Sequence, residues 1–281
     1  MKTKPAKATF TLPFYIRASI QLLQKIHPLL ATPLALKLFY TPLRFSTPPR
    51  EKKIRSEANI HRLQTENKEF TVFEWAGTGP KVILMHGWCG RASQFYSLIK
   101  SLRESGFAVY AVEAPGHGEN EMEKSNLYHF MGALRETKKH FGSFKLAVGH
   151  SLGAVAIVNI FASAGIPLVT YGSPASIRNM VTSFCNTIGA SSDVQREIIR
   201  SIEKRYNVNI DEVAPKYLLK KYQPQGLLFH CKNDEEVPMA EAHEILQSWT
   251  MAEPHFCENH GHRRILRNPQ FIEKVLALLK H

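Results

Sequence analysis

Short apolar runs alternate with longer stretches of helical periodicity along most of the chain. The apolar runs predict strands at 82–85, 107–112, 146–148, 167–171 and 227–230, and a last one around Phe256. Helical stretches follow at 95–105, 126–140, 154–164, 240–249 and 269–279. Short apolar strands that alternate with helices are typical of a mostly parallel sheet covered on both faces. The pattern therefore predicts an α/β fold.

Two segments depart from this alternation. Residues 60–63 and 69–75 flank a polar turn and predict a β-hairpin ahead of the parallel strands. Residues 174–224 show helical periodicity without a strand, and a capping box beginning at Ser192 precedes an apolar helix face. We expect this insertion to form a helical cap over the strand ends.

The first 57 residues form an arm and a linker ahead of a domain that spans residues 58–281. Residues 10–45 are apolar and basic, and the prolines at positions 13, 28, 33 and 42 predict that this arm is broken into short helical pieces. Residues 46–58 are polar and contain prolines, which predicts a linker. No apolar stretch approaches the ~20 residues that a membrane span needs. A cleaved signal is disfavoured because the apolar run is short and lacks a convincing cleavage site.

The net charge of +12 is concentrated at the N-terminus, where residues 1–50 contain eight Lys or Arg and no acidic residue. Two interpretations of the arm remain open: it packs across the body, or residues 1–45 lie on an anionic membrane surface. Nucleic-acid binding is not expected, because the basic residues are spaced singly and no reading motif accompanies them.

The 281-residue chain, with 44% hydrophobic residues, is long enough for one large core. Its four cysteines are far apart in the sequence, and no His/Cys spacing typical of a metal site recurs. These features favour a reducing, cytoplasmic location, at the membrane surface if the arm attaches there. We expect neither a cofactor nor a metal.

The strongest sequence signal is Gly149-His150-Ser151-Leu152-Gly153, which follows a strand and precedes a helix. In this context the G-x-S-x-G pattern predicts a nucleophile elbow, in which a serine at positive φ occupies a tight turn. The flanking glycines then keep the crowded backbone from clashing. A nucleophilic serine also needs a base and a carboxylate that orients the base.

Position in the sequence selects the other two groups. Among thirteen histidines, His262 follows the last strand and precedes the last helix, and His260 is its nearest rival. Only three aspartates occur, and Asp234 alone follows a strand, since Asp193 and Asp211 lie in the helical insertion. The neighbouring Glu235 and Glu236 are expected to form a solvated acidic turn.

Four motifs together resemble the α/β-hydrolase family over residues 60–281. They are His86-Gly87-Trp88, Pro115-Gly116-His117-Gly118, the elbow at Ser151, and D-x-x-V-P at Asp234 followed by Gly261-His262. The order serine, aspartate, histidine is also the order of that family. The resemblance implies that Ser151 is the nucleophile, His262 the general base and Asp234 its partner. It further implies an oxyanion hole formed by the backbone N–H groups of Trp88 and Leu152.

Several other residues in these motifs are expected to be structural. His86, His117 and His150 should hold loops through hydrogen bonds, and Cys89 should be a small pocket residue. Glu113 stands where many relatives have aspartate, and this departure concerns a structural loop.

Taken together, the motifs predict a serine hydrolase that cleaves a small-molecule carboxylic ester or thioester through an acyl-enzyme, with a short-to-medium acyl group. The alternatives are an acyltransferase or lyase that uses the same triad, and a non-catalytic protein that binds a ligand under the cap.

Overall fold

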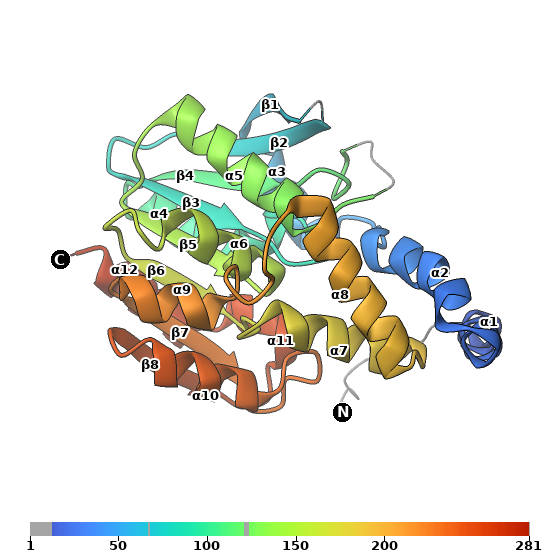
Figure 1. Ribbon diagram of the computed structural model, residues 1–281. Helices are drawn as coiled ribbons and strands as arrows, with labels where there is room; N and C mark the ends of the chain where they lie inside the picture. Colours follow the sequence, from blue (N-terminus) through green and yellow to red (C-terminus); the bar gives the residue numbers. More distant parts are fainter. Residues whose placement is uncertain (1–12, 67, 121–123, 281) are drawn as a thin grey trace, which may run out of the picture. The chain divides into compact units, whose positions relative to one another are not determined.

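The structure, a computed structural model, describes residues 13–66, 68–120 and 124–280 (Figure 1). The chain divides into two compact units. The sheet unit comprises residues 40–177 and 209–280, and the helical unit comprises residues 13–39 and 178–208.

An eight-stranded sheet in the order β1-β2-β4-β3-β5-β6-β7-β8 forms the centre of the sheet unit. β1 and β2 form an antiparallel hairpin, β2 is antiparallel to β4, and the strands from β4 to β8 pair in parallel. The strands are β1 (Asn59–Thr65), β2 (Lys68–Trp75), β3 (Lys81–Met85), β4 (Ala108–Glu113), β5 (Leu146–His150), β6 (Leu168–Tyr171), β7 (Gly226–Cys231) and β8 (Ala252–Cys257). The predicted hairpin and mostly parallel sheet are confirmed.

Helices cover both faces of this sheet (Figure 1). One group consists of α3 (Pro49–Ser56), α4 (Tyr96–Glu104) and α12 (Pro269–Leu278). The other group consists of α5 (Leu127–Phe141), α6 (Leu152–Phe161), α9 (Pro215–Tyr222) and α10 (Met239–Ser248). Because both faces are covered, every residue of the inner strands β4, β5, β6 and β7 is buried, whereas the edge strand β8 is mostly exposed or half-buried. This burial explains why these strands read as continuous apolar runs in the sequence.

Part of the segment expected to be a linker is a helix. α3 is packed on the sheet unit through Ile54, whose carbonyl accepts a hydrogen bond from the indole Nε1 of Trp75 at 2.9 Å. Its Glu51 is buried and forms an ion pair with Arg91, at 2.6 Å between Oε2 and Nε. The polar composition of this segment did not predict a packed helix. A carboxylate such as that of Glu51 is expected in solvent, but here it is buried in an ion pair.

Three helices lie between β6 and β7 in the sequence, in agreement with the predicted helical insertion. α7 (Ile177–Ile188) and α8 (Ser192–Tyr206) belong mainly to the helical unit, whereas α9 packs on α6 and α10 in the sheet unit. The capping residue of α8 is Ser191 and not Ser192, since the Ser191 hydroxyl accepts the N–H of Val194 at 3.4 Å. The predicted capping box is therefore wrong by one residue.

The arm contributes α1 (Phe14–Ile26) and α2 (Pro28–Tyr40), which join α7 and α8 in the helical unit. The side chain of Gln24 bridges the α7–α8 turn, because it donates to the Gly189 carbonyl at 3.1 Å and accepts the Ser191 N–H at 2.7 Å. The expected break at Pro33 is wrong, since α2 continues through this residue. Pro33 is the sixth residue of α2, so its missing N–H removes one intrahelical hydrogen bond, and the helix continues despite this loss.

Candidate active site

Ser151 occupies a strained turn between β5 and α6. Its φ of 51° and ψ of −122° lie outside the regions favoured by residues with a side chain. The turn is fixed at both sides, because the Ser151 N–H donates to the Tyr171 carbonyl at 2.9 Å and the Ser151 carbonyl accepts the N–H of Ala154 at 2.9 Å. The backbone thus has the geometry predicted for a nucleophile elbow.

The two elbow glycines are required by close backbone contacts. A Cβ atom on Gly149 would lie 2.4 Å from the Cα atom of Ala154, and one on Gly153 would lie 2.2 Å from the His86 carbonyl oxygen. Both distances are far shorter than any contact a side chain tolerates, and the atoms met are backbone atoms. Glycine at these positions lets α6 leave the strand immediately after Ser151 and pass close to the end of β3.

Asp234 and His262 form a buried pair at the ends of β7 and β8. The Nδ1 atom of His262 lies 2.7 Å from Oδ2 of Asp234, and both residues are 7% exposed. The other oxygen, Oδ1, accepts the N–H groups of Glu236 at 2.9 Å and Val237 at 2.8 Å. With both oxygens engaged, the carboxylate is fixed in orientation and directs the imidazole.

The environment of Asp234 favours its ionised form. Burial acts to raise the pKa of this carboxyl, but the hydrogen bond and the charge of His262 and the N–H of Val237 outweigh burial and lower the pKa. His230 lies on the other side, with Nε2 at 3.9 Å from Oδ2 of Asp234, and donates from Nε2 to the Val237 carbonyl at 2.8 Å. Asp234 is therefore available as an acceptor for the Nδ1–H of His262.

Neighbouring backbone places Ser151 beside this pair. Tyr171, which accepts the N–H of Ser151, precedes Gly172 at the end of β6. A Cβ atom on Gly172 would lie 3.1 Å from Nδ1 of His262 and 3.3 Å from Oδ2 of Asp234. The ends of β5, β6, β7 and β8 thus bring the three predicted triad residues to one edge of the sheet, where reacting groups gather in parallel sheets.

The two backbone groups predicted to form an oxyanion hole border the same turn. Leu152 begins α6, so its N–H lies in the first turn, where helix geometry provides no intrahelical acceptor. Gly87, which precedes Trp88, lies against the elbow, because a Cβ atom on it would be 2.9 Å from Cβ of Ser151. The indole ring of Trp88 packs edge-on against His117 at 4.9 Å between ring centroids.

Three motif histidines hold loops through hydrogen bonds, as predicted. His86 donates from Nδ1 to the Gly87 carbonyl at 2.8 Å and accepts the Ala114 N–H at Nε2 at 3.1 Å, which joins the loops after β3 and β4. His117 donates from Nδ1 to the Pro115 carbonyl at 3.1 Å.

His150 supports the loop that carries the candidate base. Its Nε2 donates to the His262 carbonyl at 2.9 Å, and the two rings lie 4.6 Å apart between centroids. Burial, followed by the proximity of His262, lowers the pKa of His150 to about 3, so its ring is neutral at physiological pH. A neutral His150 places no positive charge beside His262.

Glu113 is a buried structural carboxylate, consistent with its expected place in a structural loop. Its two oxygens accept the N–H groups of Ala92 and Glu119, each at 3.2 Å, and a Cβ atom on Gly118 would lie 2.0 Å from it. Burial raises the pKa of Glu113, against the lowering effect of Arg55 at 3.9 Å. The longer side chain thus ties the loop after β4 to the 3-10 helix η1 (Ala92–Phe95).

Cys89 contacts the last residues of the arm. Its Sγ accepts the N–H of Leu43 at 3.1 Å, and burial raises the pKa of its thiol. The same segment is fixed further by a hydrogen bond from the Ser125 N–H to the Tyr40 carbonyl at 2.8 Å and by Arg44, which donates to the Asn120 carbonyl. A protonated thiol engaged with backbone is consistent with a pocket residue and not with a nucleophile.

Glu236 is a neighbour of the candidate base that sequence reasoning assigned to a solvated turn. Its Oε2 lies 4.0 Å from Nε2 of His262, and its Oε1 lies 3.2 Å from Nε of Arg263. In the sequence, Glu236 is two residues after Asp234, and its N–H donates to Oδ1 of Asp234, so the two residues belong to the same turn.

The other candidates for the base and the acid, His260, Asp193 and Asp211, do not take part in the Asp234–His262 pair. His260 bonds through Nδ1 to the Glu258 carbonyl at 3.1 Å. Asp193 forms an exposed ion pair with Arg196 on α8, and Asp211 belongs to the loop before α9.

Among the described residues, one cluster could hold a metal ion: Cys231, Cys257 and His260. It adjoins the Asp234–His262 pair without including either residue.

Comparison with known proteins identifies similar chains. The model of the alpha/beta hydrolase family matches residues 82–196. The sn-1-specific diacylglycerol lipase ABHD11 of Danio rerio is 29% identical over 153 residues, which cover 50% of this chain and 46% of that protein. A Mycoplasma pneumoniae protein with esterase/lipase in its name is 22% identical over 193 residues, which cover 62% of this chain and 71% of that protein.

A solved structure shows the same fold at low sequence identity. Alpha/beta hydrolase domain-containing protein 10 from mouse superimposes with a TM-score of 0.62 at 15% identity, and the match covers 79% of this chain and 99% of that one. Within the described part of the chain, no helix is both long and apolar enough to cross a membrane.

Proposed function

Because this chain belongs to the α/β-hydrolase family, we propose that it is a serine hydrolase that cleaves a carboxylic ester or thioester through an acyl-enzyme. The observation that carries the proposal is Ser151 at positive φ beside the hydrogen-bonded pair of Asp234 and His262. Two relatives with lipase or esterase in their names support ester chemistry in particular.

In the proposed reaction, the Ser151 hydroxyl attacks the acyl carbonyl while Nε2 of His262 takes its proton. Asp234 accepts the Nδ1–H of His262 and stabilises the imidazolium that forms. The imidazolium then protonates the leaving alcohol or thiol. In the second half of the cycle His262 activates a water molecule, which releases the acid and restores Ser151.

The tetrahedral intermediates carry a negative oxygen that the backbone must stabilise. We assign this role to the N–H groups of Trp88 and Leu152, since the loop containing Gly87 and the start of α6 both border Ser151. Loss of one such donor typically raises the barrier by about 3–4 kcal/mol.

The test uses nitrophenyl esters from acetate to decanoate under stopped flow. The wild-type chain should release a stoichiometric burst of nitrophenol before steady turnover, with the best rates on short-to-medium acyl groups. Ser151→Ala should lose the burst, with kcat reduced by about 10⁴-fold or more. Ser105→Ala is the matched control, because Ser105 is exposed and bonds only within its own helix end. An equal burst in Ser151→Ala contradicts the proposal, and turnover that requires an added acceptor alcohol identifies an acyltransferase.

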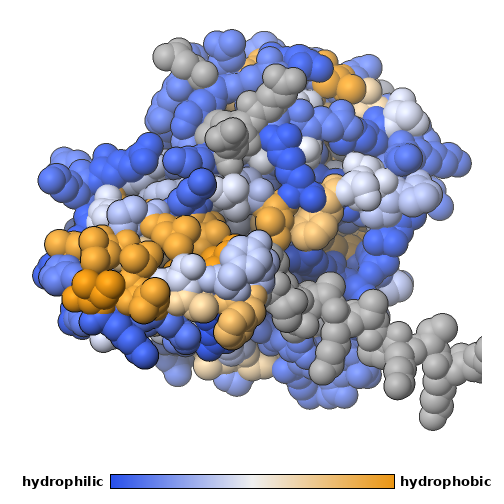
Figure 2. Space-filling view, turned by 90° about the vertical axis from the view of Figure 1, so that its right-hand side faces the viewer, coloured by the Kyte–Doolittle hydropathy of each residue, from blue (hydrophilic) through white to orange (hydrophobic). Residues whose placement is uncertain are grey.

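We further propose that the arm attaches the protein to an anionic membrane surface. α1 is packed through Ile20 and Gln24, but the side chains of Tyr15, Leu22 and Ile26 are 69%, 64% and 68% exposed. These three residues are spaced by seven and four positions, so they share one helix face. Phe14, Leu29 and Leu30 are also exposed, and Figure 2 shows apolar side chains gathered in one patch.

Charge favours an anionic partner for this face. Arg17 and Lys25 are exposed on α1, and residues 1–50 contain no acidic residue. A basic helix with exposed aromatic and aliphatic side chains binds anionic lipid by burying the apolar face at the headgroup boundary.

A further inference from the structure

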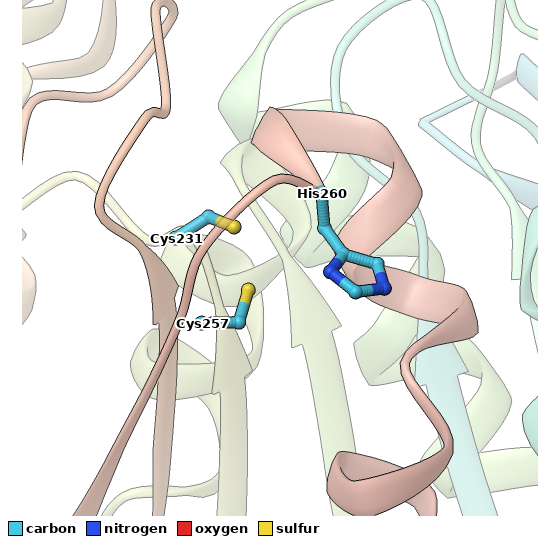
Figure 3. A group of neighbouring side chains, drawn as sticks. All are labelled: Cys231, Cys257 and His260. Carbon is cyan, nitrogen blue, oxygen red and sulfur yellow. The ribbon is translucent and has the colours of Figure 1, made fainter. Parts of the chain in front are cut away.

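A second group of reactive side chains gathers at the ends of β7 and β8. Cys231 is the last residue of β7, Cys257 is the last residue of β8, and His260 follows in the loop before α11 (Gly261–Arg264). The two sulfur atoms and one ring nitrogen all lie within 4.8 Å of one another. Figure 3 shows both thiols and the imidazole pointing toward a common point.

Strand pairing creates this cluster. Cys231 and Cys257 are direct partners in the parallel register of β7 and β8, and the Lys232 N–H donates to the Cys257 carbonyl at 2.8 Å. The two cysteines are far apart in the sequence, so no compact metal motif is visible there.

The separations suit a tetrahedral ion after a small adjustment. Zinc binds thiolate sulfur at about 2.3 Å and imidazole nitrogen at about 2.0–2.1 Å, which places neighbouring ligand atoms roughly 3.5–3.8 Å apart. The cysteines are fixed in paired strands, whereas His260 is partly exposed in a loop. Contraction of the cluster therefore requires mainly a shift of the His260 ring, whose Nδ1 bonds to the Glu258 carbonyl in the same loop.

The surroundings of the cluster also suit an ion. Cys231 and Cys257 are 0% and 8% exposed, their thiols are hydrogen-bonded to each other, and the buried Asn268 side chain bonds to Cys257. Such an outer hydrogen bond orients a ligating sulfur. His260 meanwhile lines a surface depression together with Tyr96 and Arg264, which gives an ion a path from solvent.

We propose that Cys231, Cys257 and His260 form a binding site for a thiophilic divalent ion, with zinc as its best fit and solvent in the fourth position. Binding replaces two thiol protons, which pass to solvent, by two metal–sulfur bonds, and a ring-nitrogen lone pair of His260 supplies the third bond. The ion joins the strand end that leads to Asp234 with the loop that leads to His262.

This site stands apart from the proposed hydrolase activity, since neither Asp234 nor His262 ligates the ion. Its expected effect is stabilisation of the folded chain, because an ion that binds only the folded state shifts the unfolding equilibrium.

The test titrates the fully reduced, metal-free protein with Co²⁺ and follows its absorption spectrum. One equivalent should bind and give the intense visible bands of tetrahedral cobalt with thiolate-to-metal charge transfer in the near ultraviolet, and Zn²⁺ should abolish both. Cys231→Ser and Cys257→Ser should each lose the charge-transfer band or halve it, with at least about 10-fold weaker binding.

Two sets of variants separate ligand loss from misfolding. His260→Gln alters only a partly exposed loop side chain, and it should weaken zinc binding at least about 10-fold and remove the rise in Tm on addition of zinc. Cys89→Ser and Cys185→Ser are matched controls, since these two other free cysteines lie outside the cluster. The proposal is overturned if the wild-type protein gives no thiolate–cobalt band, or if the cluster variants bind zinc as tightly as the controls. Loss of ester hydrolysis alone leaves it unaffected.

Discussion

At the scale of single residues, the proposed chemistry depends on the orientation of the Asp234 carboxylate. Asp234 uses one oxygen for two backbone N–H groups and the other for His262. An amide in its place can keep the first set of contacts but presents an N–H donor where His262 needs an acceptor. The imidazole would then favour the wrong tautomer.

Asp234→Asn should accordingly lower kcat for a nitrophenyl ester by about 10³–10⁴-fold, with a small effect on KM. Steady-state kinetics at neutral pH measure this effect. Asp193→Asn is the control, because Asp193 is exposed on α8, and it should retain wild-type rates. Comparable rates in Asp234→Asn and wild type would contradict the assigned orienting role.

Asp234 should also contribute to stability in a pH-dependent way. Burial acts to raise the pKa of Asp234, but the His262 contacts and backbone N–H lower it overall, to below the ~3.9 of an unfolded chain. The unfolded state therefore binds more protons between the two values, so the contribution is full above about pH 4 and is lost as pH falls through the folded pKa. The Tm difference between wild type and Asp234→Asn should thus shrink below about pH 4. An unchanged difference from pH 6 to pH 3 would rule out this linkage.

The motifs predicted much of the site from the sequence, because the backbone geometry at these positions allows only certain residue types. The elbow glycines, the loop histidines and the pairing of Asp234 with His262 agree with the sequence reasoning. The proximity of Glu236 to Nε2 of His262 was not predicted, since it depends on how the turn after β7 is folded.

At the scale of elements, the site depends on how tightly α6 approaches β3. A Cβ atom at position 153 would meet the Met85 and His86 carbonyl oxygens at 2.3 and 2.2 Å. These are backbone atoms of a strand end that also leads to the loop containing Trp88. A side chain there must push the helix and the candidate oxyanion loop apart.

Gly153→Ala should therefore destabilise the fold by about 1–3 kcal/mol and lower kcat at least 10-fold. Denaturant unfolding and ester kinetics measure the two effects. Gly165→Ala serves as the control, since a Cβ atom there meets nothing within 4 Å and only the φ of 69° adds strain. If both variants have wild-type turnover, the close approach is not needed for the site.

Helices and strands could be predicted where apolar residues recur with a regular period. They were harder to predict where a polar side chain is buried in an ion pair. The parallel strands and their helices follow from the apolar runs. The polar composition of residues 46–58 predicts a linker where α3 lies, because the charge of its buried Glu51 is compensated by Arg91 from another segment. The start of α8 and the passage of α2 through Pro33 depend on local hydrogen bonds that a pattern of residue types does not reveal.

At the scale of the whole molecule, the chain builds two units from interleaved segments. The arm joins two helices of the insertion in one unit, although about 140 residues separate them in the sequence. Such pairing is non-local, so periodicity alone did not indicate it. The clustering of Cys231 with Cys257 is non-local in the same sense.

The exposed face of α1 leads to a prediction for membrane binding. The full-length chain should co-sediment with vesicles containing phosphatidylserine but not with pure phosphatidylcholine. Leu22→Gln with Ile26→Gln should weaken this binding at least about 10-fold, since each buried aliphatic side chain contributes about 1.5–3 kcal/mol. Ile60→Gln is the control, as Ile60 is 56% exposed on β1. Equal binding by the double variant and the control, or none by wild type, would refute attachment through α1.

The assignment of Ser151 as the nucleophile is tested by the site of reaction with a fluorophosphonate, which forms a covalent adduct with an activated serine. Mass spectrometry of the digested wild-type protein should locate one adduct at Ser151, and both Ser151→Ala and His262→Ala should remain unlabelled while Ser105→Ala labels fully. An adduct at another residue, or equal labelling of Ser151→Ala, would contradict the assignment of Ser151 as the nucleophile.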